Sequence, residues 1–134
     1  MPVEASERMP LTTSDDVVRV RQAVRANAIK AGFSLVDQTK IITAASEIAR
    51  NTVDYGGGGS LLIALLREGG RSGLRLTFED QGPGIADLDR AMTDGFTTGN
   101  GLGLGLSGAK RLCNEFAIKS TPGSGTIVTL ARWR

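Results

Sequence analysis

The stretch EDQGPGIADLDRAMTDGFTTGNGLGLGLSGAKRL, residues 79–112, decides the fold interpretation because it places eight glycines within 34 positions, close beside several carboxylates. Ordered glycine costs conformational entropy, so such a cluster inside a folded domain needs a reason. The glycines at 99, 101, 103 and 105 lead into a helical pattern, where free backbone N–H groups would form an anion site. The segment therefore predicts a loop that holds a negatively charged ligand, although a plain flexible hinge would use the same glycines.

Length and composition favour a single domain over residues 1–134. Hydrophobic residues make up 40% of the chain and charged residues 22%, which is typical of a globular protein with a buried core. No apolar run approaches the ~20 residues of a membrane span. The N-terminal residues MPVEASERMP also lack the pattern of a secretory signal. We therefore expect a cytoplasmic protein that binds no membrane.

Charge and residue usage exclude several functions. The net charge is +2 and no dense Lys/Arg block occurs, so nucleic-acid binding has little support. The chain contains no histidine, which excludes a Ser-His-Asp triad, a Cys-His pair, a histidine-ligated zinc ion and an internal phosphohistidine. Cys113 is the single cysteine, so we expect a buried small side chain rather than a disulfide. An enzyme built from this chain would rely on carboxylates, hydroxyls, backbone dipoles or a bound metal.

Hydrophobic periodicity predicts helices and strands along the whole chain. Residues 1–12 are poorly patterned and suit either an edge strand or a loose arm. The expected helices cover about 14–32, 34–54, 87–93 and 104–115, and the expected strands cover 60–67, 74–80, 116–120 and 126–133. This order favours an α/β (α+β) two-layer sandwich, a mixed, mostly antiparallel sheet with helices on one face.

Three of the expected helices have an apolar stripe on one side. In the first helix the stripe consists of Val17, Val20, Val24 and Ile29. In the second it consists of Ile41, Ala45, Ile48 and Thr52, and in the last of Leu106, Ala109, Leu112 and Cys113.

Three polar groups are candidates for chemistry. Glu47 and Asn51 stand four residues apart, so they share one face of the second helix, outside its apolar stripe. An exposed polar pair would show the same spacing. Asp80 ends an apolar strand and precedes Gly82 and Gly84, which would let backbone approach a ligand, although a turn-capping aspartate fits as well.

The glycine-rich loop is not a familiar phosphate-binding motif. Gly103 and Gly108 have the spacing of a Walker A loop, but Ala109 stands where its lysine would be, and no dinucleotide fingerprint occurs. Near the C-terminus, Gly123, Gly125 and Thr126 lead into the last strand, which by itself is an ordinary hairpin corner.

The order of these weak signals is specific. Glu-x-x-x-Asn on a helix, Asp-x-Gly-x-Gly after a strand, a glycine-rich lid and Gly-x-Gly-Thr resemble the N, G1, G2 and G3 boxes of the GHKL (Bergerat-fold) ATPases and kinases. The resemblance covers about residues 34–130. The words VDQTKIITAASEIARN, EDQGPGI, MTDGFTTGNGLGLGLSGAKRLCNEF and GSGT are most similar to the RsbT-type switch-protein serine kinases. The anti-sigma-factor kinases share the boxes but match these words less well, and the lid GNGLGLGLSG is closer to that of a histidine kinase.

The resemblance implies roles for the candidate residues. It implies ATP and Mg²⁺ as cofactors, with Glu47 as general base and Asn51 as Mg²⁺ ligand. It also implies that Asp80 accepts the adenine amine and that Thr126 supports the same edge of the base. Backbone N–H groups would cradle the phosphates at Gly101, Leu102, Gly103, Leu104, Gly105 and Leu106.

A kinase of a partner-switching module is the function that the resemblance favours, acting on a serine or threonine of a STAS-domain antagonist protein. Two alternatives stay open. The chain could be a non-catalytic, nucleotide-gated module that activates a PP2C-type phosphatase, or an anti-sigma factor that sequesters a sigma factor. A histidine-kinase catalytic domain fits poorly, because the chain has no dimerisation helix pair and no phosphoacceptor histidine. Both a monomer and a homodimer are compatible with the pattern.

Overall fold

The computed structural model describes residues 3–82, 105–121 and 123–134. The expected helix at 87–93 and most of the glycine-rich lid lie outside these residues. The described elements follow one another as β1 (Val3–Leu11), α1 (Ser14–Lys30), α2 (Leu35–Asp54), β2 (Gly59–Glu68), β3 (Arg71–Asp80), α4 (Gly105–Arg111), β4 (Glu115–Thr121) and β5 (Gly125–Trp133).

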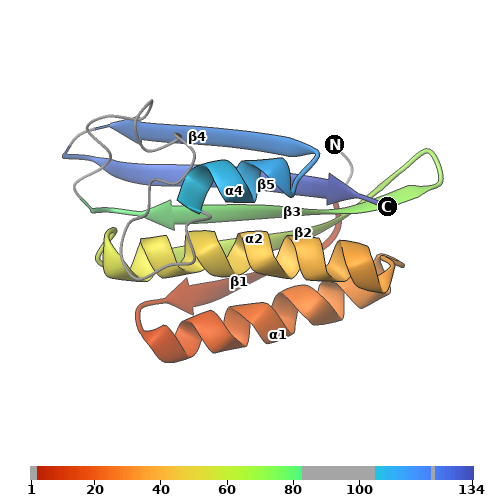
Figure 1. Cartoon of the computed structure of the whole chain (residues 1–134), viewed down its shortest axis with the longest axis horizontal. Helices are drawn as coiled ribbons and strands as arrows, with labels where there is room; N and C mark the ends of the chain where they lie inside the picture. Colours follow the sequence, from red (N-terminus) through yellow and green to blue (C-terminus); the bar gives the residue numbers. More distant parts are fainter. Residues whose placement is uncertain (1–2, 83–104, 122) are drawn as a thin grey trace.

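The five strands form one sheet in the order β1-β2-β3-β5-β4. Helices α1, α2 and α4 lie over one face of this sheet (Figure 1). The expected two-layer sandwich is therefore confirmed. All four described strand pairings are antiparallel, so the sheet that the described strands form is antiparallel throughout rather than mixed. The short turns between β2 and β3 and between β4 and β5 can join only antiparallel neighbours.

The core lies between the sheet and the helices. Leu74, Leu76 and Phe78 of β3 point into it, as the alternation of that strand predicts. The stripe of α2 is also confirmed, since its four members are at most 4% exposed. In α1 the prediction that Ile29 belongs to the buried stripe is wrong, because its side chain is 58% exposed. The helical period places Ala28 at the buried position after Val24, and Ile29 is turned about 100° away from it.

The last helix is shorter than its pattern predicts. It ends at Arg111, and Leu112 and Cys113 follow it as half-buried residues packed against the core. The chain leaves the helix because the Asn114 N–H donates to the Ala131 carbonyl, 2.9 Å away (N to O), which starts the pairing with β5. Burial raises the pKa of the Cys113 thiol to about 11, so this free cysteine stays protonated at neutral pH.

Asp16 joins the end of β1 to the start of α1. Its Oδ2 accepts hydrogen bonds from the Thr12 N–H at 2.9 Å, from the Thr12 hydroxyl at 3.0 Å and from the Thr13 N–H at 3.2 Å. Its Oδ1 pairs with Nη1 of Arg19 at 2.6 Å. These contacts, the Thr12 backbone bond first among them, hold the pKa of Asp16 at about 2. The ionised carboxylate therefore stabilises the junction.

We predict that Asp16→Asn lowers the unfolding midpoint and that the loss depends on pH. An unfolded aspartate has a pKa of about 3.9, whereas folded Asp16 titrates at about 2. The stabilisation should thus be complete above about pH 4 and disappear as the pH falls through 2. The midpoints of thermal unfolding of wild type and Asp16→Asn, compared from above pH 4 down to pH 2, measure this stabilisation. The control is Asp15→Asn, which changes an exposed aspartate. A difference that stays constant with pH would contradict the assignment.

Candidate functional site

Several chain segments gather at one end of the sandwich. The C-terminal end of α2, the end of β3 and the start of β5 meet there, beside the end of β4 (Figure 1). The strand register makes Asp80 the partner of Gly59 on β2 and of Thr126 on β5, and Thr126 in turn is the partner of Ser120 on β4. Predicted site residues that are distant in sequence are therefore neighbours.

The Asp80 carboxylate is held by two backbone groups. Its Oδ1 accepts the Gly82 N–H at 2.9 Å and the Thr126 N–H at 3.2 Å (N to O). Among the described residues, none donates a hydrogen bond to its Oδ2. Asp80 is half-buried, so one carboxylate oxygen is fixed while the other can accept a hydrogen bond from a ligand.

Two glycines make room for this carboxylate. A Cβ added to Gly56 would lie 2.5 Å from Cγ and from Oδ2 of Asp80, far inside van der Waals contact. Gly125 has a φ of +101°, and a Cβ there would lie 2.2 Å from the Asp80 carbonyl oxygen. Side chains at these two positions would displace Asp80, so this arrangement of the carboxylate requires glycine at both.

Thr126 and Ser120 complete the same edge. Thr126 is only 9% exposed, and its Oγ1 lies 2.9 Å from Oγ of Ser120. The Ser120 hydroxyl also lies 3.4 Å from the Gly125 carbonyl oxygen, a longer contact. Hydroxyl groups therefore stand beside the fixed carboxylate at the site.

Glu47 is buried, which excludes the alternative of an exposed polar pair. Its exposed fraction is 8%, and Asn51, one helical turn later, is half-buried with polar contacts of its own. Helix α2 lies between α1 and α4 and also rests on the sheet (Figure 1), so residues 44–49 are all buried. Nη1 of Arg50 approaches Oε2 of Glu47 to 3.6 Å and compensates part of its charge.

The predicted phosphate loop is described only at its end. Gly105 begins α4, and the Leu106 side chain is buried against the core, so only its backbone could contact a ligand. Gly84 and the stretch from Gly101 to Leu104 lie outside the described residues. The Ser107 hydroxyl, in the first turn of α4, is buried without a hydrogen-bond partner in the described part of the chain.

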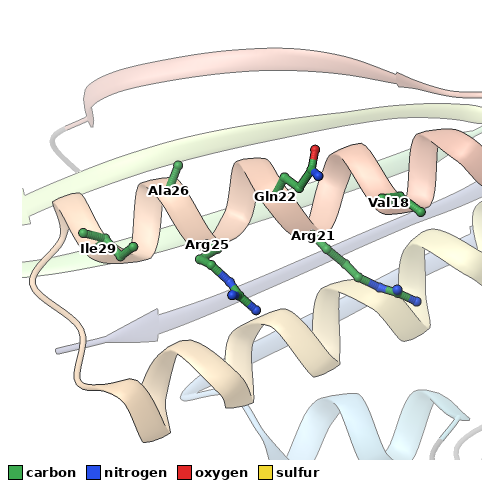
Figure 2. A pocket seen from close by; sticks show the side chains of 6 residues that line it. All are labelled: Val18, Arg21, Gln22, Arg25, Ala26 and Ile29. Atoms are coloured by element: carbon green, nitrogen blue, oxygen red, sulfur yellow. The ribbon is translucent and has the colours of Figure 1, made fainter.

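A hollow of about 430 Å³ lies along the outer side of α1 (Figure 2). It is lined by Val18, Arg21, Gln22, Arg25, Ala26 and Ile29. The side chains of Arg21 and Arg25 extend over α2, and Nε of Arg21 donates to Oγ of Ser46 at 2.9 Å (Figure 2). The hollow shares no residue with the Asp80 site and is separate from that site.

Two features are absent from the described residues. Among residues 3–82, 105–121 and 123–134, no three His, Cys, Asp or Glu side chains come together in a cluster that could hold a metal ion. No described helix is both long and apolar enough to cross a membrane.

Comparison with known proteins identifies the family. Residues 36–134 match the model of the histidine kinase-, DNA gyrase B- and HSP90-like ATPases. The chain belongs to this ATPase family. It is 46% identical over 123 residues to the serine/threonine-protein kinase RsbT of Bacillus subtilis, a match that covers 92% of each chain. It is 30% identical over 128 residues to an anti-sigma F factor of a Thermoanaerobacter species, covering 92% of this chain and 89% of the relative.

Solved structures share the fold. The RsbU and RsbW domains of a Mycobacterium tuberculosis protein superpose with a TM-score of 0.67 at 22% identity, over 97% of this chain and 33% of that chain. The mycobacterial sensor histidine kinase MprB superposes with a TM-score of 0.54 at 18% identity, over 96% of this chain and 97% of that chain.

The site fits the adenine end of a nucleotide. Oδ2 of Asp80, which accepts no hydrogen bond from the described residues, can accept one from an exocyclic amine, and the absence of a Cβ at Gly56 leaves room for this carboxylate. Sequence reasoning missed Gly56, Arg50 and Ser120. Ser120 carried a usable signal, because it continues the inward positions of Phe116 and Ile118 and is polar where they are apolar.

We predict that Gly56→Ala weakens ATP binding by roughly tenfold or more, because the new methyl group displaces a carboxylate that should accept a hydrogen bond. Isothermal titration calorimetry with ATP and Mg²⁺ measures the loss. Gly57→Ala is a matched control, since Gly57 has a φ of +72° but a Cβ there meets nothing within 4 Å. Gly57→Ala reports backbone strain alone, so an equal loss in both variants would argue against the steric explanation.

Proposed function

We propose that this chain is an ATP-dependent protein serine/threonine kinase of a bacterial partner-switching module and that it phosphorylates a STAS-domain antagonist protein in the cytoplasm. The observation that carries the proposal is a buried Glu47 one helical turn before Asn51, in a chain 46% identical to a named serine/threonine-protein kinase. We further propose that residues 1–134 act as one catalytic domain, without a role in membrane or nucleic-acid binding.

Nucleotide recognition in this proposal centres on Asp80. Oδ2 accepts a hydrogen bond from the adenine amine, while the two backbone N–H groups on Oδ1 keep the carboxylate in place. The Thr126 hydroxyl hydrogen-bonds to the ring nitrogen next to the amine, directly or through one water. The backbone N–H groups from Gly101 to Leu106 bind the phosphates, as a helix N-terminus favours.

Glu47 and Asn51 act at the phosphate end. When bound, ATP would supply the γ-phosphoryl group, and Mg²⁺ would neutralise charge on the phosphate oxygens. Asn51 offers an amide oxygen, a ligand type that Mg²⁺ accepts alongside phosphate oxygens and water. The Glu47 carboxylate takes the proton from the acceptor hydroxyl. At the same time the oxygen of that hydroxyl forms the new bond to the γ-phosphorus, and the bond from the γ-phosphorus to the ADP oxygen breaks.

An anti-sigma factor is the second candidate, and the 30% identity to an anti-sigma F factor favours it. In that case the chain would hold a sigma factor. A nucleotide-gated module that activates a PP2C-type phosphatase is a further alternative. Pull-down from the source cell with and without ATP separates them: a STAS protein supports the kinase, and a sigma factor or a phosphatase supports the alternatives. Sedimentation of the purified chain distinguishes monomer from homodimer.

We predict that Asp80→Asn weakens ATP binding roughly ten- to a hundredfold while the protein stays folded. The asparagine carbonyl can replace Oδ1 on the two backbone N–H groups, which places the amide NH₂ at the position of Oδ2. A donor then faces the adenine amine. Calorimetry measures the affinity, and the exposed neighbour Glu79→Gln is the control. Unchanged affinity in folded Asp80→Asn would remove adenine recognition from this residue.

We predict that Glu47→Gln slows phosphoryl transfer by ~10²–10⁴-fold, because a positioned general base contributes about that much. ATP affinity should change little, whereas Asn51→Ala should reduce Mg²⁺-dependent binding and transfer together. The assay uses labelled ATP and the STAS protein recovered by pull-down, with the phosphoserine or phosphothreonine located by mass spectrometry.

Equal transfer by wild type and Glu47→Gln would rule out Glu47 as the base. A wild-type protein that binds ATP but labels no recovered partner would favour the nucleotide-gated binding module over the kinase.

A further inference from the structure

One side of α1 carries a row of exposed side chains. Its members recur at intervals of four, three and four residues, which places them along one side of the helix. They are Val18, Gln22, Arg25 and Ile29, and all four are exposed. The two apolar members end the row, about 16 Å apart at a rise of about 1.5 Å per residue. The hollow of α1 lies along this row and thus has an apolar side chain at each end (Figure 2).

Two arginines that line the hollow keep their positive charge uncompensated in the described part of the chain. Residues 17–30 contain four cations and no Asp or Glu. Arg19 is paired with Asp16 at 2.6 Å. Arg21 and Arg25, by contrast, form no ion pair with a carboxylate of the described residues.

Two of the three carboxylates in the neighbouring helix α2 already belong to other ion pairs. Asp37 pairs with Nη2 of Arg132 at 2.7 Å. Glu47 lies 3.6 Å from Nη1 of Arg50. The third carboxylate, Asp54, does not line the hollow. The hollow is therefore a positively charged surface with apolar ends, and we refer to the residues that line it as the α1 face.

We propose that the α1 face docks an acidic segment of the STAS-domain antagonist protein. The segment places carboxylates on Arg21 and Arg25 and apolar side chains against Val18 and Ile29. This inference rests on the proposed function, which supplies the partner, and it adds the surface that recognises this partner. A carboxylate can accept two hydrogen bonds from one guanidinium. The two arginines lie one helical turn apart, so carboxylates about 5–6 Å apart fit both of them.

A second copy of this chain fits the α1 face less well than an acidic partner. A two-fold interface sets the same patch of both copies against itself. Arg21 and Arg25 would then face the arginines of the other copy, and like charges brought together at an interface are costly. An acidic segment instead supplies the negative charge that the described residues leave out.

The α1 face lies beside the proposed catalytic helix and apart from the nucleotide site. Nε of Arg21 donates to Oγ of Ser46, the residue before Glu47 in α2. The face shares no residue with the Asp80 site. A protein docked there is held next to α2. The α1 face should therefore determine the affinity for the partner, without changing the affinity for ATP or the rate of the transfer step.

The experiment uses the STAS protein recovered by pull-down and then purified. Its dissociation constant, and the KM and kcat of phosphoryl transfer to it, are measured for wild type and Arg25→Glu. The charge reversal should weaken partner binding roughly tenfold or more and raise KM for the partner by a similar factor. The kcat at saturating partner and the affinity for ATP should stay as in wild type. Arg25→Gln, which only removes the charge, should show a smaller loss of the same kind.

Lys30→Glu is the matched control for Arg25→Glu. It makes the same change of charge at an exposed position of the same helix, turned about 140° away from Arg25. It should bind the partner as wild type does. An equal loss in both variants would reduce the effect to long-range attraction and would overturn the docking site.

A second pair of variants tests the apolar ends of the face. Val18→Ser should weaken partner binding roughly three- to tenfold, because it removes an apolar side chain that the partner covers. Val36→Ser makes the same change at an exposed valine of α2 outside the α1 face, and it should have no effect. Equal affinities of these two variants for the partner would contradict the apolar contact.

A photo-crosslinking side chain in place of Gln22 identifies the docked segment. Illumination of the complex should join this position to a peptide of the STAS protein that contains at least two Asp or Glu residues, located by mass spectrometry. A crosslinked peptide without carboxylates would overturn the proposed acidic segment.

The outcomes separate docking from the kinase function. A folded Arg25→Glu that binds the partner as wild type does would overturn the docking site, while labelling of that partner would leave the kinase intact. A partner whose binding depends on Arg25 but that is never labelled would overturn the kinase and support docking. Recovery of no STAS protein would overturn both. Self-association of the purified chain that Arg25→Glu alters would assign the α1 face to a second copy and overturn the proposal.

Discussion

The hydrogen bonds from the Gly82 and Thr126 backbone N–H groups to Oδ1 of Asp80 are the constraint on which the site depends. They join the end of β3 to the start of β5 and fix one oxygen of a half-buried carboxylate. Because a carboxylate that accepts two N–H bonds cannot rotate freely, its second oxygen points in a defined direction. The glycines at 56 and 125 follow from this arrangement, since any side chain there would occupy the same space.

The position of α2 in the helical layer explains why Glu47 is buried. A helix with one neighbour buries a narrow stripe, but α2 packs against α1, α4 and the sheet and buries all of residues 44–49. Glu47 is thereby removed from water, with only Arg50 as an ion-pair partner in the described part of the chain. The structure thus places a largely buried carboxylate beside Arg50, one helical turn before Asn51.

Much of the fold could be predicted because its signals are local. The periods of α1, α2 and β3 and the short hairpin turns located the described elements other than β1, with errors mainly at their ends, whereas residues 1–12 were left open between an edge strand and a loose arm. The errors have different causes. Ile29 lies five residues after Val24, so the helical period itself places Ala28 rather than Ile29 on the buried side. By contrast, α4 stops at Arg111 because the following residues pair with β5, which a hydrophobic pattern alone does not show.

The sequence by itself determined the family resemblance, the chemistry excluded by the absence of histidine, and the candidates Glu47, Asn51, Asp80 and Thr126, since these depend on residue types and spacing. Only the tertiary structure decided that Glu47 is buried and that Asp80, Thr126 and Ser120 form one row. The physical reason is that burial and strand register arise from contacts between distant segments. Asp80 and Thr126 are 46 residues apart, and no local pattern specifies that their backbones meet.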